Sequence, residues 1–303
     1  MSAFSIVFTT ARHEPEFQWL YDSVRRESDC PIIVIGLGLE NYAGWHAATF
    51  HPPKPTVWQG PHRLTKDQWW AKSNAANTGI CLCRTEWVMF CDDRGVLLPG
   101  WRAAVEDAMA GGYGVCGSYE KRHGMVVESG IIADPGTLDG SDPRSPQGRD
   151  HRALVSSALA DAPGSWWFGC VNALPLEWAL QVNGYEELMD SLSMEDCIFG
   201  LMLKNNGFPL KYDPRLKLIE DRTPGKCGPA MRRSSKERWP NDAEDKGHGA
   251  LARFGVRKRT EHHWDLRAIR AAVLRGGPFP RHNGHPERDW FDGMKIQDFD
   301  KIP

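Results

Sequence analysis

The sequence predicts an α/β fold in which a mostly parallel, doubly wound sheet carries helices on both faces. Two apolar, β-rich runs, at residues 4–10 and 31–36, flank residues 17–24, whose apolar side chains recur at helical spacing. A third apolar run, at residues 87–91, follows another segment of helical character. Strands that alternate with helices in this way are joined by crossovers, and such crossovers produce parallel sheets covered on both faces.

The other expected elements follow in order along the chain. Residues 101–109 carry their apolar side chains on one face, which is the pattern of an amphipathic helix. Residues 135–150 combine turn-forming residues with charges and predict a mobile loop. Further helices are expected at residues 68–81, 197–203 and 266–274, and short strands at residues 113–118 and 126–133.

Composition indicates a globular protein with a core of normal size. The chain has 303 residues, of which 41% are hydrophobic and 25% are charged. No stretch approaches the roughly 18 consecutive apolar residues of a transmembrane helix. The N-terminus lacks the basic start and cleavage site of a secretory signal. We therefore expect no transmembrane segment and a cytoplasmic location.

Cysteine usage and charge distribution narrow the function classes. The eight cysteines form no CxxC pair and show no zinc spacing, so we expect reduced thiols in the core. A formal net charge of −2 argues against a strongly basic nucleic-acid binder, but the charge is unevenly placed. Residues 215–275 hold 16 Lys and Arg against 8 Asp and Glu. This basic stretch is the part of the chain suited to a polyanion.

The most informative local feature is the acidic pair Asp92 and Asp93, which directly follows the apolar run at residues 87–91. Open α/β sheets bind their ligands beyond the carboxyl ends of the strands. Hard divalent cations prefer carboxylate oxygens, and an ion bound to a diphosphate needs only one or two of them. The same pair also suits a simple turn before Gly95, so both interpretations stay open from these residues alone.

Three segments in fixed order resemble the family 2 glycosyltransferases of the GT-A fold. They are residues 71–80 (AKSNAANTGI), residues 90–101 (FCDDRGVLLPGW) and residues 184–208, which contain GYEE and a later ED pair. The resemblance implies a nucleoside-diphosphate sugar as donor, a UDP-sugar first of all, and Mn²⁺ or Mg²⁺ as cofactor. It also implies a nucleotide-sugar-binding half at residues 1–115, an acceptor-binding half at residues 116–225 and a basic C-terminal extension at residues 226–303.

The resemblance also implies roles for individual residues on the donor side. Asp93 and Asp92 are the implied metal ligands, with Asp92 turned toward the ribose and His248 as the candidate third ligand. The implied donor contacts are Thr9, Arg12, Glu40, Lys72, Asn77, Asp92 and Asp93. The chain departs from the family pattern in three places. Arg94 stands where many relatives have a third Asp. Glu40 stands in for an Asp that is usually found after the second strand. Ala76 replaces a common Arg, so Lys72 becomes the candidate contact for the diphosphate.

On the acceptor side, Glu195 and Asp196 open the helix expected at residues 197–203. They also fit a capping role, because Ser193 precedes them and acids in a first turn complement the helix dipole. The resemblance implies that Asp196 is the general base and that Glu195 orients the acceptor. A base opposite the leaving group inverts the anomeric configuration.

Of Trp166 and Trp167, adjacent in an expected strand, one should face the core and the other should stack on the acceptor.

The sequence therefore favours an inverting, metal-dependent glycosyltransferase, and two alternatives stay open. A nucleotidyltransferase would normally show a glycine-rich loop after the first strand, but residues 9–14 contain no glycine. The second alternative is a non-catalytic module that binds sugar nucleotides. It is favoured by Arg94 in the acidic motif and by the absence of the Asp that the family usually has after the second strand. The acceptor is a saccharide, a small molecule or a hydroxymethylated nucleic-acid base held by the basic stretch.

Overall fold

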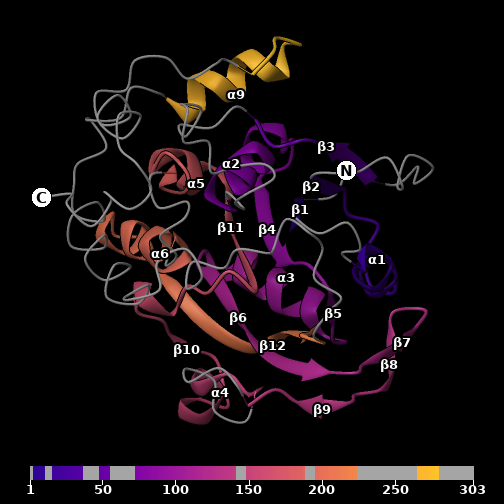
Figure 1. The fold of residues 1–303 in the computed structure, drawn as a ribbon. Helices are drawn as coiled ribbons and strands as arrows, with labels where there is room; N and C mark the ends of the chain where they lie inside the picture. The colour runs from indigo at the N-terminus through magenta and orange to yellow at the C-terminus, as the bar shows by residue number, and fades with distance from the viewer. Residues whose placement is uncertain are drawn as a thin grey trace, which may run out of the picture.

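A computed structural model of the protein describes residues 3–10, 16–36, 48–54, 72–140, 148–187, 195–223 and 265–279. Within these residues, one large sheet has the strand order β10-β12-β6-β11-β4-β1-β2-β3 (Figure 1). The strands are β1 (Phe4–Thr10), β2 (Ile32–Gly36), β3 (Ala48–His51), β4 (Trp87–Asp92), β5 (Gly95–Leu97), β6 (Gly114–His123), β7 (Val126–Glu128), β8 (Ile131–Asp134), β9 (Thr137–Leu138), β10 (Ala160–Asp161), β11 (Val171–Pro175) and β12 (Leu210–Asp221). The helices are α1 (Phe17–Arg25), α2 (Lys72–Leu82), α3 (Trp101–Gly111), α4 (His151–Val155), α5 (Leu176–Gln181), α6 (Glu195–Asn205) and α9 (Leu266–Leu274), with a 3₁₀ turn, η3, at Gly164–Trp166.

The sheet is mostly parallel, which confirms the predicted fold class. Strands β3, β2, β1 and β4 are mutually parallel neighbours. Strand β11 is antiparallel to both β4 and β6, so β6 and its parallel partner β12 run in the same direction as β4. Thr9 pairs with Asp92 across β1 and β4, so the carboxyl ends of these two strands are level. The ends of β6 and β12 open toward the same edge, and this edge carries the candidate site.

The two faces of the sheet are covered by different helices, as alternation along the strands requires. In β1, Val7 packs with apolar residues of α2, α5, α6 and α9 on one face. Its neighbours Ile6 and Phe8 pack with α1 and α3 on the other face. Figure 1 shows α2 and α5 on the side opposite α1. Two separate core layers, one on each face, therefore hold the doubly wound sheet in shape.

The structure corrects two local predictions. Residues 126–133 form not one strand but the hairpin β7–β8, because Ser129 and Gly130 both adopt positive φ values (50° and 73°), the geometry of a tight hairpin turn. Gly130 also lies against the α1 backbone, where a Cβ would come within 2.3 Å of the Ser23 nitrogen. Trp166 and Trp167 lie not in a strand but at η3, so strand alternation does not apply to them.

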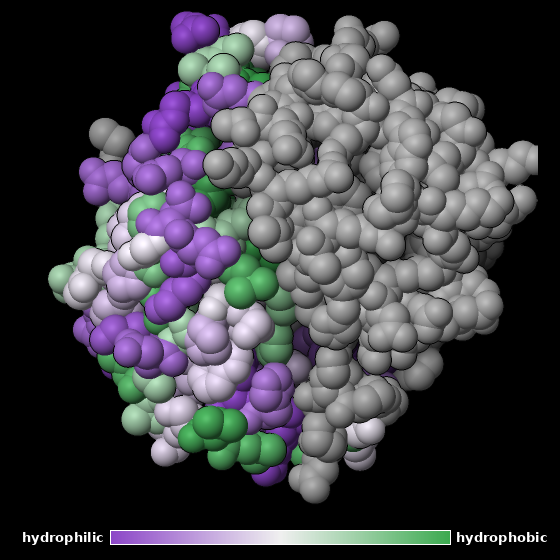
Figure 2. Space-filling model, turned by 90° about the vertical axis from the view of Figure 1, so that its left-hand side faces the viewer, coloured by the Kyte–Doolittle hydropathy of each residue, from purple (hydrophilic) through white to green (hydrophobic). Residues whose placement is uncertain are grey.

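The cysteine prediction is confirmed for the thiols that the structure describes: all are free and buried, while Cys227 lies outside the described residues. In the described parts of the chain, no helix combines the length and apolar character needed to cross a membrane. Figure 2 shows one face of the molecule, where hydrophilic residues cover much of the described surface and apolar residues appear as separate patches. The described residues therefore form no large apolar patch on this face.

Candidate active site

A cavity of about 290 Å³ opens at the carboxyl ends of β4, β6 and β12, beside the first turns of α2 and α6. This is the position at which open α/β sheets bind ligands. Its walls combine carboxylates, cationic groups and aromatic rings. They are formed by Lys72, Asp92, Tyr119, Lys121, His151, Phe168, Gly169, Cys170, Glu195, Asp196, Cys197, Glu220 and Arg222.

Lys72 links the two acidic motifs of the sequence. Its Nζ donates to Asp92 Oδ1 over 2.7 Å, and the two side chains are 25% and 23% exposed. Burial alone would lower the pKa of Lys72, but the charges of Asp92, Glu195 and Asp196 hold that pKa well above its usual value. The ammonium group is therefore charged at neutral pH. The structure brings Lys72, Asp92, Glu195 and Asp196 together, as the sequence predicted for one site.

Asp196 is held by the backbone of the segment that precedes β11. Its Oδ2 accepts a hydrogen bond from the Gly169 N–H over 2.7 Å. A Cβ at Gly169 would come within 2.5 Å of Lys72 Nζ and 3.4 Å of Asp196 Oδ2. Only glycine fits there without displacing one of these groups. Asp196 is thus oriented by a backbone amide and lies at the cavity wall, where it can reach a bound hydroxyl group.

Glu195 differs from an ordinary surface carboxyl group. Burial, followed by the neighbouring charge of Asp196, raises the pKa of Glu195 to about 7, although Lys72 opposes the shift. In the unfolded chain the same group would titrate near pH 4.5. The folded protein therefore binds an extra proton between these two values, and its stability falls as the pH rises through that window.

We expect Glu195→Gln to stabilise the protein at pH 8 and to change its stability little at pH 4.5. The gain comes from removing the cost of a buried charge and is at most about 3 kcal/mol, since one pKa unit corresponds to about 1.4 kcal/mol. Thermal unfolding of both proteins across this pH range measures it. Glu128→Gln, which changes an exposed carboxyl group in β7, is the matched control. Equal melting temperatures of wild type and Glu195→Gln at pH 8 would contradict the raised pKa.

Asp93 and its neighbours bear on the predicted metal. Thr10 Oγ1 donates to Asp93 Oδ2 over 2.8 Å, which fixes this carboxylate at the ends of β1 and β4. The side chain of Arg94 is 1% exposed, and its Nη2 donates to Asp221 Oδ2 over 2.7 Å. The third position of the acidic motif is therefore turned into the protein and paired, and it is not a metal ligand.

The carboxylates present fit a divalent ion that arrives with a diphosphate. Among the described residues, no three or more potential ligands are grouped closely enough to hold an ion alone. Mg²⁺ bound to a nucleotide needs only one or two protein carboxylates, however, because phosphates and water complete its shell. Asp92 lines the cavity and Asp93 follows it in the chain, so these two carboxylates are the candidates for such a pair. Burial raises the pKa of nearby Glu220, and the charges of Asp92 and Asp93 raise it further, so a cation at this end of the cavity would relieve mutual repulsion.

Asn77 lies in the core. It is completely buried, donates to Tyr185 O over 2.9 Å and to Glu187 Oε1 over 2.8 Å, and accepts from Tyr185 N over 2.7 Å. These contacts join two of the segments on which the family resemblance rests, residues 71–80 and the GYEE segment. Asn77 therefore holds α2 to the chain that leads toward α6, and it does not line the cavity.

The tryptophans and Thr9 also lie away from the cavity walls. Trp167 is completely buried, and Trp166 packs edge-on against Tyr212. The aromatic ring that this segment presents to the cavity belongs to the next residue, Phe168. Thr9 is buried in β1, and its neighbour Thr10 makes the contact with the acidic pair. Arg12, Glu40 and His248 lie outside the described residues.

Several residues that line the cavity were not predicted from the sequence. They are Tyr119 and Lys121 of β6, His151 of α4, Phe168, Cys170, Glu220 and Arg222. Of these, only Phe168 and Cys170 lie close in sequence to predicted site residues, Trp166 and Trp167. The others come together because β11 inserts between β4 and β6 and because β12 pairs with β6.

Comparisons with known proteins bear on the fold. No protein-family model and no curated protein sequence matches the chain. Among solved structures, GalNAc-T7 with UDP, GalNAc and Mn²⁺ aligns over 99% of this chain and 56% of its own, with a TM-score of 0.52 and 13% identity. The chain has a GT-A fold. The aligned chain spans about half the length of GalNAc-T7. The assignment to family 2 stays a prediction.

Two further likenesses are weaker. S. aureus TarS 1–349 in complex with UDP-GlcNAc aligns over 77% of this chain and 62% of its own, with a TM-score of 0.47 and 11% identity. S. aureus TarS aligns over 74% and 38%, with a TM-score of 0.46 and 12% identity.

Proposed function

We propose that the protein is an inverting glycosyltransferase that moves a sugar from a nucleoside-diphosphate sugar, a UDP-sugar first of all, to a hydroxyl acceptor. The observation that carries this proposal is the placement of two acidic sites across one cavity, with Asp92 at the end of β4 and Asp196 in the first turn of α6. Lys72, charged and close to both, lies where the two sites meet. GalNAc-T7, which shares the fold, has been crystallised with UDP and Mn²⁺.

The proposed reaction assigns roles to Asp196 and Lys72. The acceptor oxygen attacks the anomeric carbon, its proton passes to a carboxylate oxygen of Asp196, and the bond from that carbon to the diphosphate oxygen breaks. The nucleoside diphosphate leaves with the bonding electron pair. Lys72 offsets the negative charge that develops on the leaving group, in a partly buried site where such an interaction is stronger than in water. Attack from the side opposite the leaving group inverts the anomeric configuration.

The metal and the acceptor belong to the same proposal. Asp93 and Asp92 would hold Mn²⁺ or Mg²⁺, which supplies further charge neutralisation at the diphosphate. Phe168, Tyr119 and His151 give the cavity an aromatic wall suited to the apolar face of a sugar or a small ring. This wall favours a saccharide or a small molecule as the acceptor. A hydroxymethylated base in DNA stays a candidate through the basic stretch at residues 215–275, most of which lies outside the described residues.

A panel of UDP-, GDP- and dTDP-sugars tests the function directly. We expect nucleoside diphosphate to be released from at least one donor in the presence of Mn²⁺, faster when an acceptor is added, and nuclear magnetic resonance should show an inverted anomeric carbon. Sugar-nucleotide binding without turnover would identify a non-catalytic module. Release of pyrophosphate from nucleoside triphosphates would identify a nucleotidyltransferase. A product that retains its anomeric configuration would contradict the role given to Asp196.

A further inference from the structure

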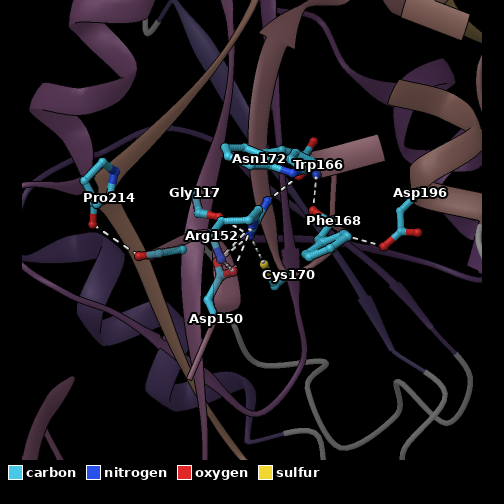
Figure 3. A network of polar contacts seen from close by, with 11 residues as sticks. Gly117, Asp150, Arg152, Trp166, Phe168, Cys170, Asn172, Asp196 and Pro214 are labelled. Carbon is cyan, nitrogen blue, oxygen red and sulfur yellow. Dashed lines mark hydrogen bonds and ion pairs between the residues drawn. The ribbon is translucent and has the colours of Figure 1, made fainter. Parts of the chain in front are cut away.

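A buried arginine lies behind the wall of the cavity that carries Asp196. Arg152, in α4, is completely buried together with its partner Asp150 (Figure 3). Its Nε is 3.0 Å from both carboxylate oxygens of Asp150, and its Nη2 donates to Asp150 Oδ2 over 2.7 Å. Asp150 also caps α4 by accepting from the Arg152 N–H. Asp150 therefore neutralises the guanidinium group and fixes one edge of it. The remaining N–H groups of Arg152 can bond to nearby backbone carbonyl groups.

Those other donors hold the turn that precedes β11. Nη2 donates to Gly117 O in β6 over 2.6 Å, and Nη1 donates to Trp166 O. The guanidinium carbon lies 4.3 Å from the centre of the Phe168 ring, so the cation also stacks on that ring. One side chain thus ties β6 to both ends of the three-residue segment from Trp166 to Phe168.

The segment held by Arg152 leads directly to the proposed base. Trp166 O accepts from the Phe168 N–H over 2.9 Å as well as from Arg152, which closes the turn. The peptide that follows presents the Gly169 N–H to Asp196 Oδ2 over 2.7 Å. Figure 3 shows this order of contacts from Arg152 through Trp166 and Phe168 toward Asp196. Because the Gly169 N–H belongs to this turn, a displacement of the turn moves the amide that donates to Asp196.

We propose that Arg152 is a positioning residue: by fixing the turn from Trp166 to Gly169, it holds the Asp196 carboxylate in the orientation that receives the acceptor proton. This inference rests on the proposed function, because it takes Asp196 as the base. Arg152 does not itself line the cavity, so it acts through the residues that it holds in place. Misplacing a reacting group by about 1 Å can cost roughly 100-fold in rate, which is the scale of effect expected here.

Arg152→Lys is the informative change. It keeps the positive charge beside Asp150, but a single ammonium group cannot also reach Gly117 O and Trp166 O or stack as a plane on Phe168. The turn keeps a second attachment that does not involve Arg152, because Gly164 and Gly200 bring η3 and α6 into backbone contact. We expect a folded protein whose kcat for transfer falls about 10- to 100-fold, while the KM for the donor is nearly unchanged.

The decisive measurement is a double-mutant cycle with Asp196→Asn. If Arg152 acts through Asp196, Arg152→Lys changes kcat by no more than about twofold in the Asp196→Asn background. A similar loss in both backgrounds, or no loss in wild type, would overturn the inference. Arg25→Lys is the matched control. Arg25 also donates to two carbonyl groups, Ser28 O and Cys30 O, and lies over the Tyr21 ring, but it is in α1 and does not line the cavity.

An activity-independent readout separates this inference from the proposed function. Amide hydrogen exchange at Gly169 reports its hydrogen bond to Asp196 directly. We expect faster exchange at Gly169 in Arg152→Lys and unchanged exchange in Arg25→Lys. If no donor is turned over by the wild-type protein, the proposed function fails, whatever the exchange result. If exchange at Gly169 is the same in wild type and Arg152→Lys, the positioning inference fails even for an active enzyme.

Discussion

Replacing Asp196 with Asn is expected to lower the rate of sugar transfer by about 10²- to 10⁴-fold, the usual effect of losing a general base. Asp196 accepts from the Gly169 N–H at Oδ2 and from the Cys197 N–H at Oδ1. Asn has nearly the same size, and its one amide oxygen can keep the bond from Gly169, so the turn before β11 should stay in place while the bond from Cys197 is lost. An amide oxygen cannot take up the proton of the acceptor. Single-turnover transfer assays measure the chemical step, and calorimetry with the donor measures binding, which should change little.

The matched control for this change is Asp161→Asn, which makes the same substitution at an exposed carboxylate in β10. It should leave transfer unaffected. Transfer by Asp196→Asn at nearly the wild-type rate would mean that Asp196 only stabilises the first turn of α6 and that another group takes the proton. Loss of donor binding in parallel with transfer would instead place Asp196 at the donor.

Local sequence patterns were sufficient for β1, β2 and β4, but not for their parallel neighbour β3. Strands β1, β2 and β4 are short, apolar on both faces and separated by segments of helical periodicity, so each is recognisable without its neighbours. The hairpin at Ser129–Gly130 was missed because its turn depends on positive φ at a serine, which apolar patterning does not reveal. Strand β12 was not expected because it mixes charged and apolar residues and shifts register between Asp213 and Lys217.

Some residues of the candidate site could likewise be proposed from local sequence patterns, and others could not. Asp92, Glu195 and Asp196 stand in recognisable motifs at element ends, so they could be proposed from the sequence, and all three line the cavity. Phe168 and Arg152 could not be assigned roles, because their positions follow from long-range pairing of β11 with β4 and β6. Asn77 shows the opposite case: the family resemblance implied a donor contact for this motif residue, but its amide lies in the core and holds Tyr185 and Glu187.

The second large effect is expected when the acidic pair Asp92 and Asp93 is changed. Asp93→Ala should abolish metal-supported transfer and weaken Mn²⁺-dependent UDP binding by at least about 10-fold. Loss of a group that merely supports a metal ligand typically costs 10- to 100-fold in affinity or activity, and a direct ligand should cost no less. The fold should survive, because the side chain lies in a turn beyond β4, where it accepts from a hydroxyl group, Thr10 Oγ1. Calorimetric titration of UDP with and without Mn²⁺ measures the effect independently of turnover.

A graded series distinguishes a metal ligand from a turn residue. Thr10→Val removes the hydroxyl that donates to Asp93 Oδ2 but keeps the carboxylate, so it should weaken Mn²⁺-dependent binding less than Asp93→Ala does. Asp29→Ala, at an exposed carboxylate after α1, should weaken it not at all. If Asp93→Ala binds UDP as tightly as wild type in Mn²⁺ and keeps full transfer in EDTA, the diphosphate charge must be neutralised by side chains alone. Lys72, already charged and bonded to Asp92, would then be the first residue to change.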